Sequence, residues 1–595
     1  VAQSIRMIEA GCELVRITAP SKKEAENLAN IKKELLSKGY TTPLCADIHY
    51  TPNAAEIAAR IVEKVRVNPG NYTDKKKFET IEYTDESYQK ELARIRERFI
   101  PLIEICKDHG TVIRIGTNHG SLSDRILSRF GDTPLGMVES AMEFLRICEE
   151  LDFHDVILSM KASNTQVMVQ AYRLLVSTMM EHGMDYPLHL GVTEAGEGED
   201  GRIKSAVGIG TLLEDGLGDT IRVSLTEEPE LEIPVAKALA DRYSERKVTQ
   251  KPIKDYMNGY PIDPFQYKKR KTETVLNIGG DNVPRVIGDL SDKTSITPAN
   301  LYAFGYNYSI DNDKWNLTDL ACDYLYLGKG SLNFTFPETL GIIQDPEVWS
   351  AENEQHYPLF DAVDYTGNTQ KSDTLNFVQS DLIGLNEEFV QQLKGDSTAV
   401  LVLHTTNTHA MPELRRAIAL LMKHNCKTPV IVRREYQLEE DDFQLFAATD
   451  IGGLLIEGLS DGAWLENVEV SDHLINSTSF GILQAARARI SKTEYISCPS
   501  CGRTLFDLQE TTAKIRERTD HLKGLKIGIM GCIVNGPGEM ADAHYGYVGT
   551  GNGKITLYKG QKVVRKNIPS NEALEALEDL IKENGDWVES PISIN

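Results

Sequence analysis

Short apolar runs alternate with longer amphipathic segments over residues 1–245. Each run is rich in Val, Ile and Leu, and each is followed by a segment whose apolar positions recur with the period of a helix. The runs are Leu14–Thr18, Pro43–His49, Lys64–Pro69, Thr111–Asn118, Val156–Ser163, Leu188–Glu194 and Thr220–Leu225. Repeated strand–helix units of this kind predict an α/β fold with a parallel sheet covered by helices.

Seven such runs are one fewer than a (β/α)8 TIM-type barrel contains. The chain begins with a helical segment, Ala2–Ala10, which in a barrel would follow a strand. We therefore predict a (β/α)8 barrel whose first strand precedes Val1 and is missing from this chain. An open doubly wound sheet is the alternative fold.

A second region, residues 246–485, opens with a polar, lysine-rich stretch that lacks an apolar period. A helix is predicted over Pro412–His424, and strands are predicted over Thr274–Ile278, Tyr324–Leu327, Ala399–His404, Pro429–Arg433 and Gly453–Ile456. We interpret this region as an α/β insertion domain, with a degenerate barrel as one candidate architecture. It contains no motif that we can connect to chemistry, so we expect a structural role.

The last region, residues 486–595, has the pattern of a small α/β domain. A helix is predicted near Asp507–Thr519, a strand over Lys526–Met530 and a closing helix over Asn571–Lys582. A glycine- and proline-rich turn follows the strand.

Composition excludes several classes of protein. The 64 basic and 88 acidic residues give a net charge of −24, which argues against a nucleic-acid-binding protein because such a protein needs a basic face. No apolar run approaches the roughly 18–20 residues of a membrane span. Nine cysteines are an odd and sparse set, which indicates a reducing compartment rather than a disulfide framework.

Polar side chains recur near the ends of the predicted strands of residues 1–245. Four arginines stand between apolar neighbours at Arg16, Arg66, Arg114 and Arg222, joined by Asp47, Asn118, Lys161, Glu194 and Ser224. Four buried Arg–carboxylate pairs would explain the arginines. Alternatively, they converge at the carboxyl ends of barrel strands, where active sites of this fold lie, and guanidinium groups there suit a diphosphate.

A separate set of thiols lies near the end of the chain. Cys498 and Cys501 form a C-x-x-C motif, and Cys532 follows a predicted strand. Three thiolates could hold an iron–sulfur cluster with one open position, which Glu539 could fill. A structural zinc site and plain buried thiols remain alternatives, although a four-cysteine zinc site would need a second C-x-x-C motif.

Both sets of residues occur in motifs that resemble the 4-hydroxy-3-methylbut-2-enyl diphosphate synthase family. The motifs are ADIH (Ala46–His49), VRVNPGN (Val65–Asn71), RIGTNHGSL (Arg114–Leu122), SMKAS (Ser159–Ser163), PLHLGVTEAG (Pro187–Gly196), DTIRVSL (Asp219–Leu225), CPSCGRTLFDLQE (Cys498–Glu510) and MGCIVNGPGE (Met530–Glu539). The resemblance covers roughly residues 1–245 and 486–595, and the insertion between them resembles the three-domain, plant-like form of the family.

The resemblance implies an oxidoreductase that opens 2-C-methyl-D-erythritol 2,4-cyclodiphosphate in the non-mevalonate isoprenoid pathway. It implies a [4Fe–4S] cluster on Cys498, Cys501, Cys532 and Glu539. It implies phosphate binding by Arg16, Arg66, Arg114, Lys161 and Arg222, with help from Asn118 and Ser224. It also implies acid–base roles for Asp47 and Glu194.

The same resemblance implies reduced ferredoxin or flavodoxin as the electron donor, and a bacterial cytoplasm or plastid stroma as the compartment. A homodimer is one expected assembly, and neither a nucleic acid nor a membrane is an expected partner. Two rival functions are a metal-dependent barrel lyase with a structural zinc site and an iron–sulfur electron carrier without catalytic activity.

Overall fold

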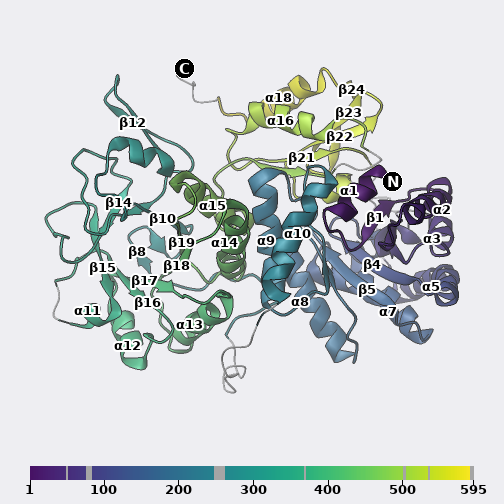
Figure 1. The fold of residues 1–595 in the computed structure, drawn as a ribbon, viewed down its shortest axis with the longest axis horizontal. Helices are drawn as coiled ribbons and strands as arrows, with labels where there is room; N and C mark the ends of the chain where they lie inside the picture. The colour runs from purple at the N-terminus through teal and green to yellow at the C-terminus, as the bar shows by residue number, and fades with distance from the viewer. Residues whose placement is uncertain are drawn as a thin grey trace. The chain divides into compact units, whose positions relative to one another are not determined.

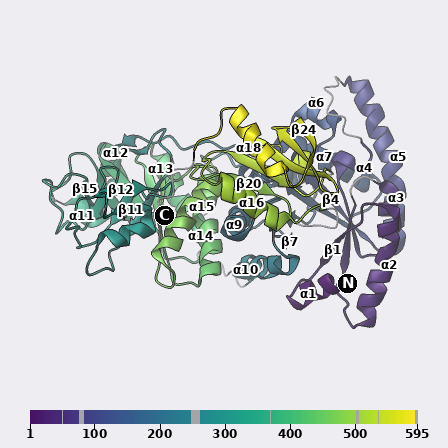
Figure 2. The same cartoon turned by 90° about the horizontal axis from the view of Figure 1, so that it is seen from above.

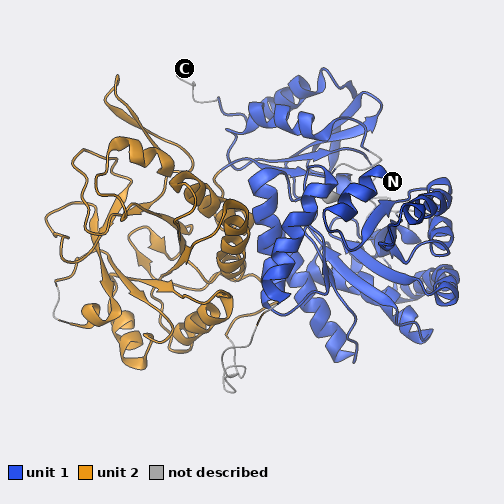
Figure 3. Ribbon diagram, in the orientation of Figure 1, with its two compact units in different colours: residues 1–244, 492–595 blue, residues 245–491 orange. Residues whose placement is uncertain are grey.

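The computed structural model describes residues 1–48, 51–74, 83–244, 246, 261–367, 370–499, 504–533 and 536–589, without the side chain of Glu539. The chain forms two compact units (Figure 3). Unit 1 combines residues 1–244 with residues 492–595, and unit 2 comprises residues 245–491. No helix among the described residues is both long and apolar enough to cross a membrane.

The first part of unit 1 contains the strands expected from the sequence. They are β1 (Val15–Thr18), β2 (Leu44–Asp47), β3 (Lys64–Val67), β4 (Val112–Asn118), β5 (Val156–Lys161), β6 (His189–Leu190) and β7 (Thr220–Ile221). Strands β1 to β5 pair in parallel in chain order, as do β6 and β7. A parallel bridge between Leu158 and Leu188 joins the two sets.

One helix precedes β1, others follow the strands, and they lie on the outside of the sheet (Figures 1 and 2). They are α1 (Ala2–Glu9), α2 (Lys22–Ser37), α3 (Pro52–Ala58), α4 (Pro69–Tyr72), α5 (Asp85–His109), α6 (Asp124–Phe130), α7 (Pro134–Glu150), α8 (Thr165–Glu181), α9 (Gly198–Glu214), the short η1 (Pro229–Leu231) and α10 (Glu232–Ser244). Buried Ile113, Ile115 and Met160 occupy one set of alternate strand positions, and the arginines occupy the other set. Since successive side chains of a strand point to opposite faces, the apolar set meets the helices and the polar set faces inward.

The second part of unit 1 is an α/β domain with one mixed sheet. Its elements are β20 (Glu494–Ser497), α16 (Leu508–Thr519), β21 (Lys526–Met530), α17 (Gly536–Glu539), β22 (Tyr545–Gly551), β23 (Lys554–Lys559), β24 (Lys562–Pro569) and α18 (Ala573–Glu583). The first three strands are parallel, and β23 and β24 complete the sheet in antiparallel pairing. Leu508 and Ile515 of α16 and Leu577 and Ile581 of α18 pack on one face of this sheet.

Unit 2 is built on a closed, eight-stranded parallel barrel, which agrees with the expectation of an α/β insertion domain with a barrel as a candidate architecture. The barrel strands are β10 (Arg285–Asp289), β13 (Tyr324–Tyr326), β14 (Gly341–Gln344), β15 (His356–Asp361), β16 (Asn376–Ser380), β17 (Ala399–His404), β18 (Val430–Tyr436) and β19 (Gly462–Asn467). Strand β10 pairs with β19 and closes the barrel. Its interior holds a continuous apolar core that includes Tyr324, Phe377 and Trp464.

Two strand predictions in unit 2 were wrong. Gly453–Ile456 is the last turn of helix α14 (Glu440–Ile456), which is buried on all sides and therefore lacks the polar face that marks a helix in a sequence. Thr274–Ile278 spans a hairpin of β8 (Thr274–Val275) and β9 (Ile278–Gly279), which is not among the barrel strands but packs Val275 and Ile278 into the barrel core. The other elements are η2 (Pro298–Phe304), β11 (Tyr306–Ser309), β12 (Lys314–Leu317), α11 (Ala362–Thr366), α12 (Glu387–Gly395), α13 (Met411–Lys423) and α15 (Asp472–Ala485).

A buried ion pair between α6 and α7 provides a test of the packing around the unit 1 sheet. Arg125 donates to both carboxylate oxygens of Glu143 at 2.6 Å. Replacing Glu143 with Ala leaves a buried guanidinium and should lower the free energy of unfolding of unit 1 by about 3–5 kcal/mol. Replacing Glu139, whose partner Arg146 is half-exposed, should cost less than about 1 kcal/mol. Urea denaturation of both variants measures the difference, and equal costs would contradict it.

Candidate active site

The inward face of the unit 1 strands carries a cluster of five cations. Arg16, Arg66 and Arg114 come from β1, β3 and β4, Lys161 ends β5, and Arg222 directly follows β7. Burial lowers the pKa of Lys161 well below its usual value, and positive neighbours lower it further, in the order Arg114, Arg222, Arg16 and Arg66. The five side chains therefore share one electrostatic environment.

Carboxylates neutralise part of this cluster. Asp47, at the end of β2, accepts from Arg16 at 3.0 Å and from Arg66 at 3.1 Å. Glu232, the first residue of α10, lies 3.6 Å from Arg222. Three of the four arginines therefore have carboxylate partners. This agrees with the explanation of the arginines as buried Arg–carboxylate pairs.

Arg114 and Lys161 do not fit the explanation by buried pairs with carboxylates. They are 3% and 5% exposed, and neither makes a hydrogen bond or an ion pair with any residue that the structure describes. Burial of a cation without a counter-charge is costly, so a bound anion would stabilise both side chains. The interior of this barrel is thus suited to a multiply charged anion.

Two glycines make space for the cations. A Cβ atom on Gly116 of β4 would lie 2.6 Å from Nε of Arg66, and one on Gly191 would lie 2.7 Å from Nζ of Lys161. The sequence analysis missed both positions. Their signal was a glycine within or next to a strand, which often marks a close approach of another group.

The uncharged candidates differ in their surroundings. Asn118 accepts a hydrogen bond from Arg66 at 3.3 Å and so orients that guanidinium. The hydroxyl groups of Ser224 and Ser159 are buried without a hydrogen-bond partner among the described residues. Ser159 belongs to the same inward face and was not singled out from the sequence.

Glu194 lies in the turn between β6 and α9 and is 4% exposed. Its φ of +48° falls in the left-handed region, which is uncommon for a residue other than glycine. Strained backbone of this kind clusters at functional sites, where surrounding structure holds it in place. Arg222 is electrostatically coupled to Glu194, so this carboxylate belongs to the same site.

The thiols lie at the ends of two neighbouring strands of the second part of unit 1. Cys498 directly follows β20, and its sulfur accepts from the backbone N–H of Gly531 at 3.2 Å. Cys532 is the next residue after Gly531, so the strand pairing brings the two cysteines together. Cys501 and the side chain of Glu539 lie outside the described part of the chain.

The loop after β4 meets the short helix α17, which follows β21. A Cβ atom on Gly120, whose φ is +77°, would lie only 1.9 Å from the carbonyl oxygen of Gly538. Only glycine permits this approach. The contact joins the RIGTNHGSL and MGCIVNGPGE motifs within unit 1.

The low pKa of Lys161 generates a prediction about protons. A bound anion favours the charged ammonium form and so raises this pKa, which means that binding takes up protons at pH values between the free and bound pKa. Affinity for inorganic pyrophosphate should therefore rise as the pH falls through that window. Lys161→Met should abolish the uptake and weaken binding about 10–100-fold. Calorimetry in buffers of different ionisation enthalpy measures this proton uptake. Identical binding heats in all buffers would refute its assignment to Lys161.

Comparisons with known proteins agree with this arrangement. Residues 1–237 match the family model described as the GcpE TIM-barrel domain, and residues 494–583 match the GcpE protein C-terminal domain. A 4-hydroxy-3-methylbut-2-en-1-yl diphosphate synthase (flavodoxin) of Parabacteroides distasonis is 52% identical over 99% of this chain and 93% of its own length.

More distant relatives carry the same activity in their names. The flavodoxin-dependent synthase of Leptospira interrogans is 45% identical over 99% of this chain and 92% of its own length. The chloroplastic, ferredoxin-dependent synthase of Arabidopsis thaliana is 42% identical over 100% of this chain and 84% of its own length. With its TIM-type barrel, its strand-end thiols and these relatives along its whole length, the chain belongs to the 4-hydroxy-3-methylbut-2-en-1-yl diphosphate synthase family of oxidoreductases.

Proposed function

We propose that this chain opens the ring of 2-C-methyl-D-erythritol 2,4-cyclodiphosphate by reduction. Two electrons and two protons enter, a C–O bond to the bridging phosphate breaks, and water leaves to give 4-hydroxy-3-methylbut-2-enyl diphosphate. Reduced flavodoxin or ferredoxin supplies the electrons, as the names of the relatives indicate for those proteins.

The observation that carries this proposal is the buried pair Arg114 and Lys161, neither of which forms a hydrogen bond or an ion pair with a described residue. A diphosphate supplies the missing negative charge, and guanidinium forks match its oxygens in bidentate geometry. Arg16, Arg66 and Arg222 complete the phosphate site. Asn118 assists by orienting Arg66, and Ser224 offers a hydroxyl group to the ligand.

The donor set near the end of unit 1 suits an iron–sulfur cluster. We assign a [4Fe–4S] cluster to Cys498, Cys501, Cys532 and Glu539. The N–H group of Gly531 that reaches the sulfur of Cys498 is typical of such sites, where hydrogen bonds to sulfur tune the reduction potential. When bound, the cluster would transfer the electrons one at a time to the substrate.

The two carboxylates Glu194 and Asp47 have different proposed roles. Glu194 is held in a strained turn beside the cations, which suits a group that handles the proton needed when water leaves. Asp47 contacts two guanidinium groups, and we assign it chiefly to hold Arg16 and Arg66 in place. The loop contact of Gly120 with Gly538 supports a site completed within one chain, which a homodimer would contain twice.

Unit 2 differs from unit 1 at the carboxyl ends of its barrel strands. Arg433 forms a bidentate pair with Glu466, at 2.5 and 3.1 Å, and also donates to Gln379 at 3.0 Å. Its guanidinium lies over the ring of Trp464, 4.4 Å from the centroid. Because the guanidinium of Arg433 already pairs with side chains of its own barrel, we propose a structural role for unit 2.

Anaerobic purification tests the cofactor assignment. We expect about four irons and four sulfides per chain, with a broad visible band that dithionite bleaches. Cys498→Ser and Cys532→Ser should lose the cluster, whereas Cys426→Ser, a buried thiol in unit 2, should keep it. Glu539→Gln should alter the resting spectrum and abolish turnover. Zinc without iron would instead favour a metal-dependent lyase with a structural zinc site.

A pair of glycine variants tests the loop contact. Gly120→Ala and Gly110→Ala both place a side chain at positive φ, with strain of about 1–2 kcal/mol each. Only Gly120→Ala collides with Gly538, since nothing lies within 4 Å of a Cβ atom on Gly110. We expect Gly120→Ala to lose turnover at least about 100-fold while it still binds pyrophosphate. Equal turnover of the two variants would show that the contact has no role in catalysis.

A further inference from the structure

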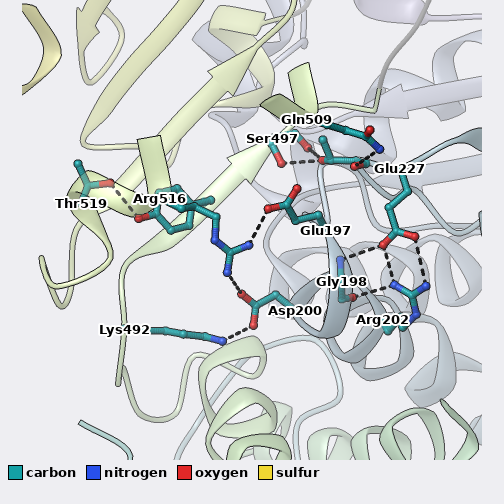
Figure 4. Close-up of polar contacts among 12 residues, drawn as sticks. Glu197, Gly198, Asp200, Arg202, Glu227, Lys492, Ser497, Gln509, Arg516 and Thr519 are labelled. Carbon is teal, nitrogen blue, oxygen red and sulfur yellow. Dashed lines mark hydrogen bonds and ion pairs between the residues drawn. The ribbon is translucent and has the colours of Figure 1, made fainter. Parts of the chain in front are cut away.

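A group of ion pairs joins the two parts of unit 1 beside the candidate site (Figure 4). Arg516 of α16 donates to Glu197 at 3.0 Å and to Asp200 at 3.4 Å. Lys492, which precedes β20, also donates to Asp200. We refer to Glu197, Asp200, Lys492 and Arg516 as the clasp.

The clasp holds the turn that carries Glu194. Glu197 follows Glu194 by three positions, and the turn between them includes Gly196 at a φ of +107°. The carbonyl of Gly196 accepts from the backbone N–H of Thr226 at 2.9 Å. The turn is therefore fixed by the barrel on one side and by α16 on the other.

A second contact runs parallel to the clasp. The hydroxyl groups of Thr226 and Ser497 lie 2.7 Å apart, and Ser497 directly precedes Cys498. Gln509, in the first turn of α16, donates to the carbonyl of Thr226 at 3.2 Å. The position of the cysteine strand is thus tied to the loop that follows Arg222 and Ser224.

The clasp is accessible to solvent. The side chains of Arg516, Asp200 and Glu197 are 32%, 28% and 24% exposed, and a cavity of about 590 Å³ borders them. Ion pairs in such surroundings are individually weak and are screened by salt. They suit a contact that sets the position of two parts rather than one that holds a fold together.

We propose that Arg516 is a positioning residue, which couples the seating of the thiol-bearing domain on the barrel to the placement of the Glu194 carboxylate. The proposal rests on the function proposed above. In this view, Arg516 contacts neither the substrate nor the cluster and acts through Glu197 and the turn.

The test compares four variants with the wild-type holoenzyme. Arg516→Gln should lower kcat about tenfold with little change in KM, because a small displacement of a catalytic group slows the chemical step more than it weakens binding. Lys514→Gln is the matched control, since Lys514 pairs among the described residues only with exposed Glu510 on the same helix, and it should leave kcat unchanged. Exchange of the charges in Arg516→Glu with Glu197→Arg should recover most of the loss from Arg516→Glu alone.

A second readout does not depend on activity. Hydrogen exchange of residues 193–201 should accelerate in Arg516→Gln and in wild type at high salt, but not in Lys514→Gln. Iron content and pyrophosphate affinity should be unchanged in all variants. If the wild type lacks iron or turnover, the proposed function is wrong. Hydrogen exchange then still shows whether Arg516 holds the turn of residues 193–201 in place.

Two results would overturn the positioning role. One is an Arg516→Gln variant that matches Lys514→Gln in both kcat and exchange. The other is a charge-exchanged double variant that is no better than Arg516→Glu, which would show that the Arg516–Glu197 pair does not carry the effect.

Discussion

The interior of the unit 1 barrel is governed by one constraint, the burial of cations without enough carboxylates to neutralise them. Asp47 pairs with two arginines, and Glu232 lies near a third, whereas Arg114 and Lys161 form no ion pair with a described residue. Since an uncompensated buried charge is costly, the surrounding structure must hold it in place. The apolar outward face of the strands, packed on helices, provides that stability.

The two barrels of the chain show how a shared architecture can serve different ends. The interior of unit 2 is an apolar core. At the carboxyl ends of its strands, polar side chains pair with one another, as Arg433 does with Glu466. The interior of unit 1 is polar, and glycines give its long side chains space. Function therefore follows from which face of the strands carries charge, and the barrel fold alone does not specify it.

Much of the architecture could be predicted from local patterns. The strands of residues 1–245 and the helices α13, α16 and α18 were evident because each combines a clear period with marked ends. Five strands of the unit 2 barrel, among them β14 and β19, were missed, and α14 was mistaken in part for a strand. A short strand or helix that is buried on all sides carries no alternation of polar and apolar residues.

The sequence by itself determined the chemistry available to this protein, since it supplied arginines between apolar neighbours, a C-x-x-C motif and the motifs of one family. Whether the arginines were paired could not be read from it, because an ion pair joins residues far apart in the chain, such as Arg16 and Asp47. The tertiary structure alone decided that Arg114 and Lys161 form no ion pair within the described part of the chain. It alone also decided that Gly120 meets Gly538, because such approaches depend on how whole elements pack.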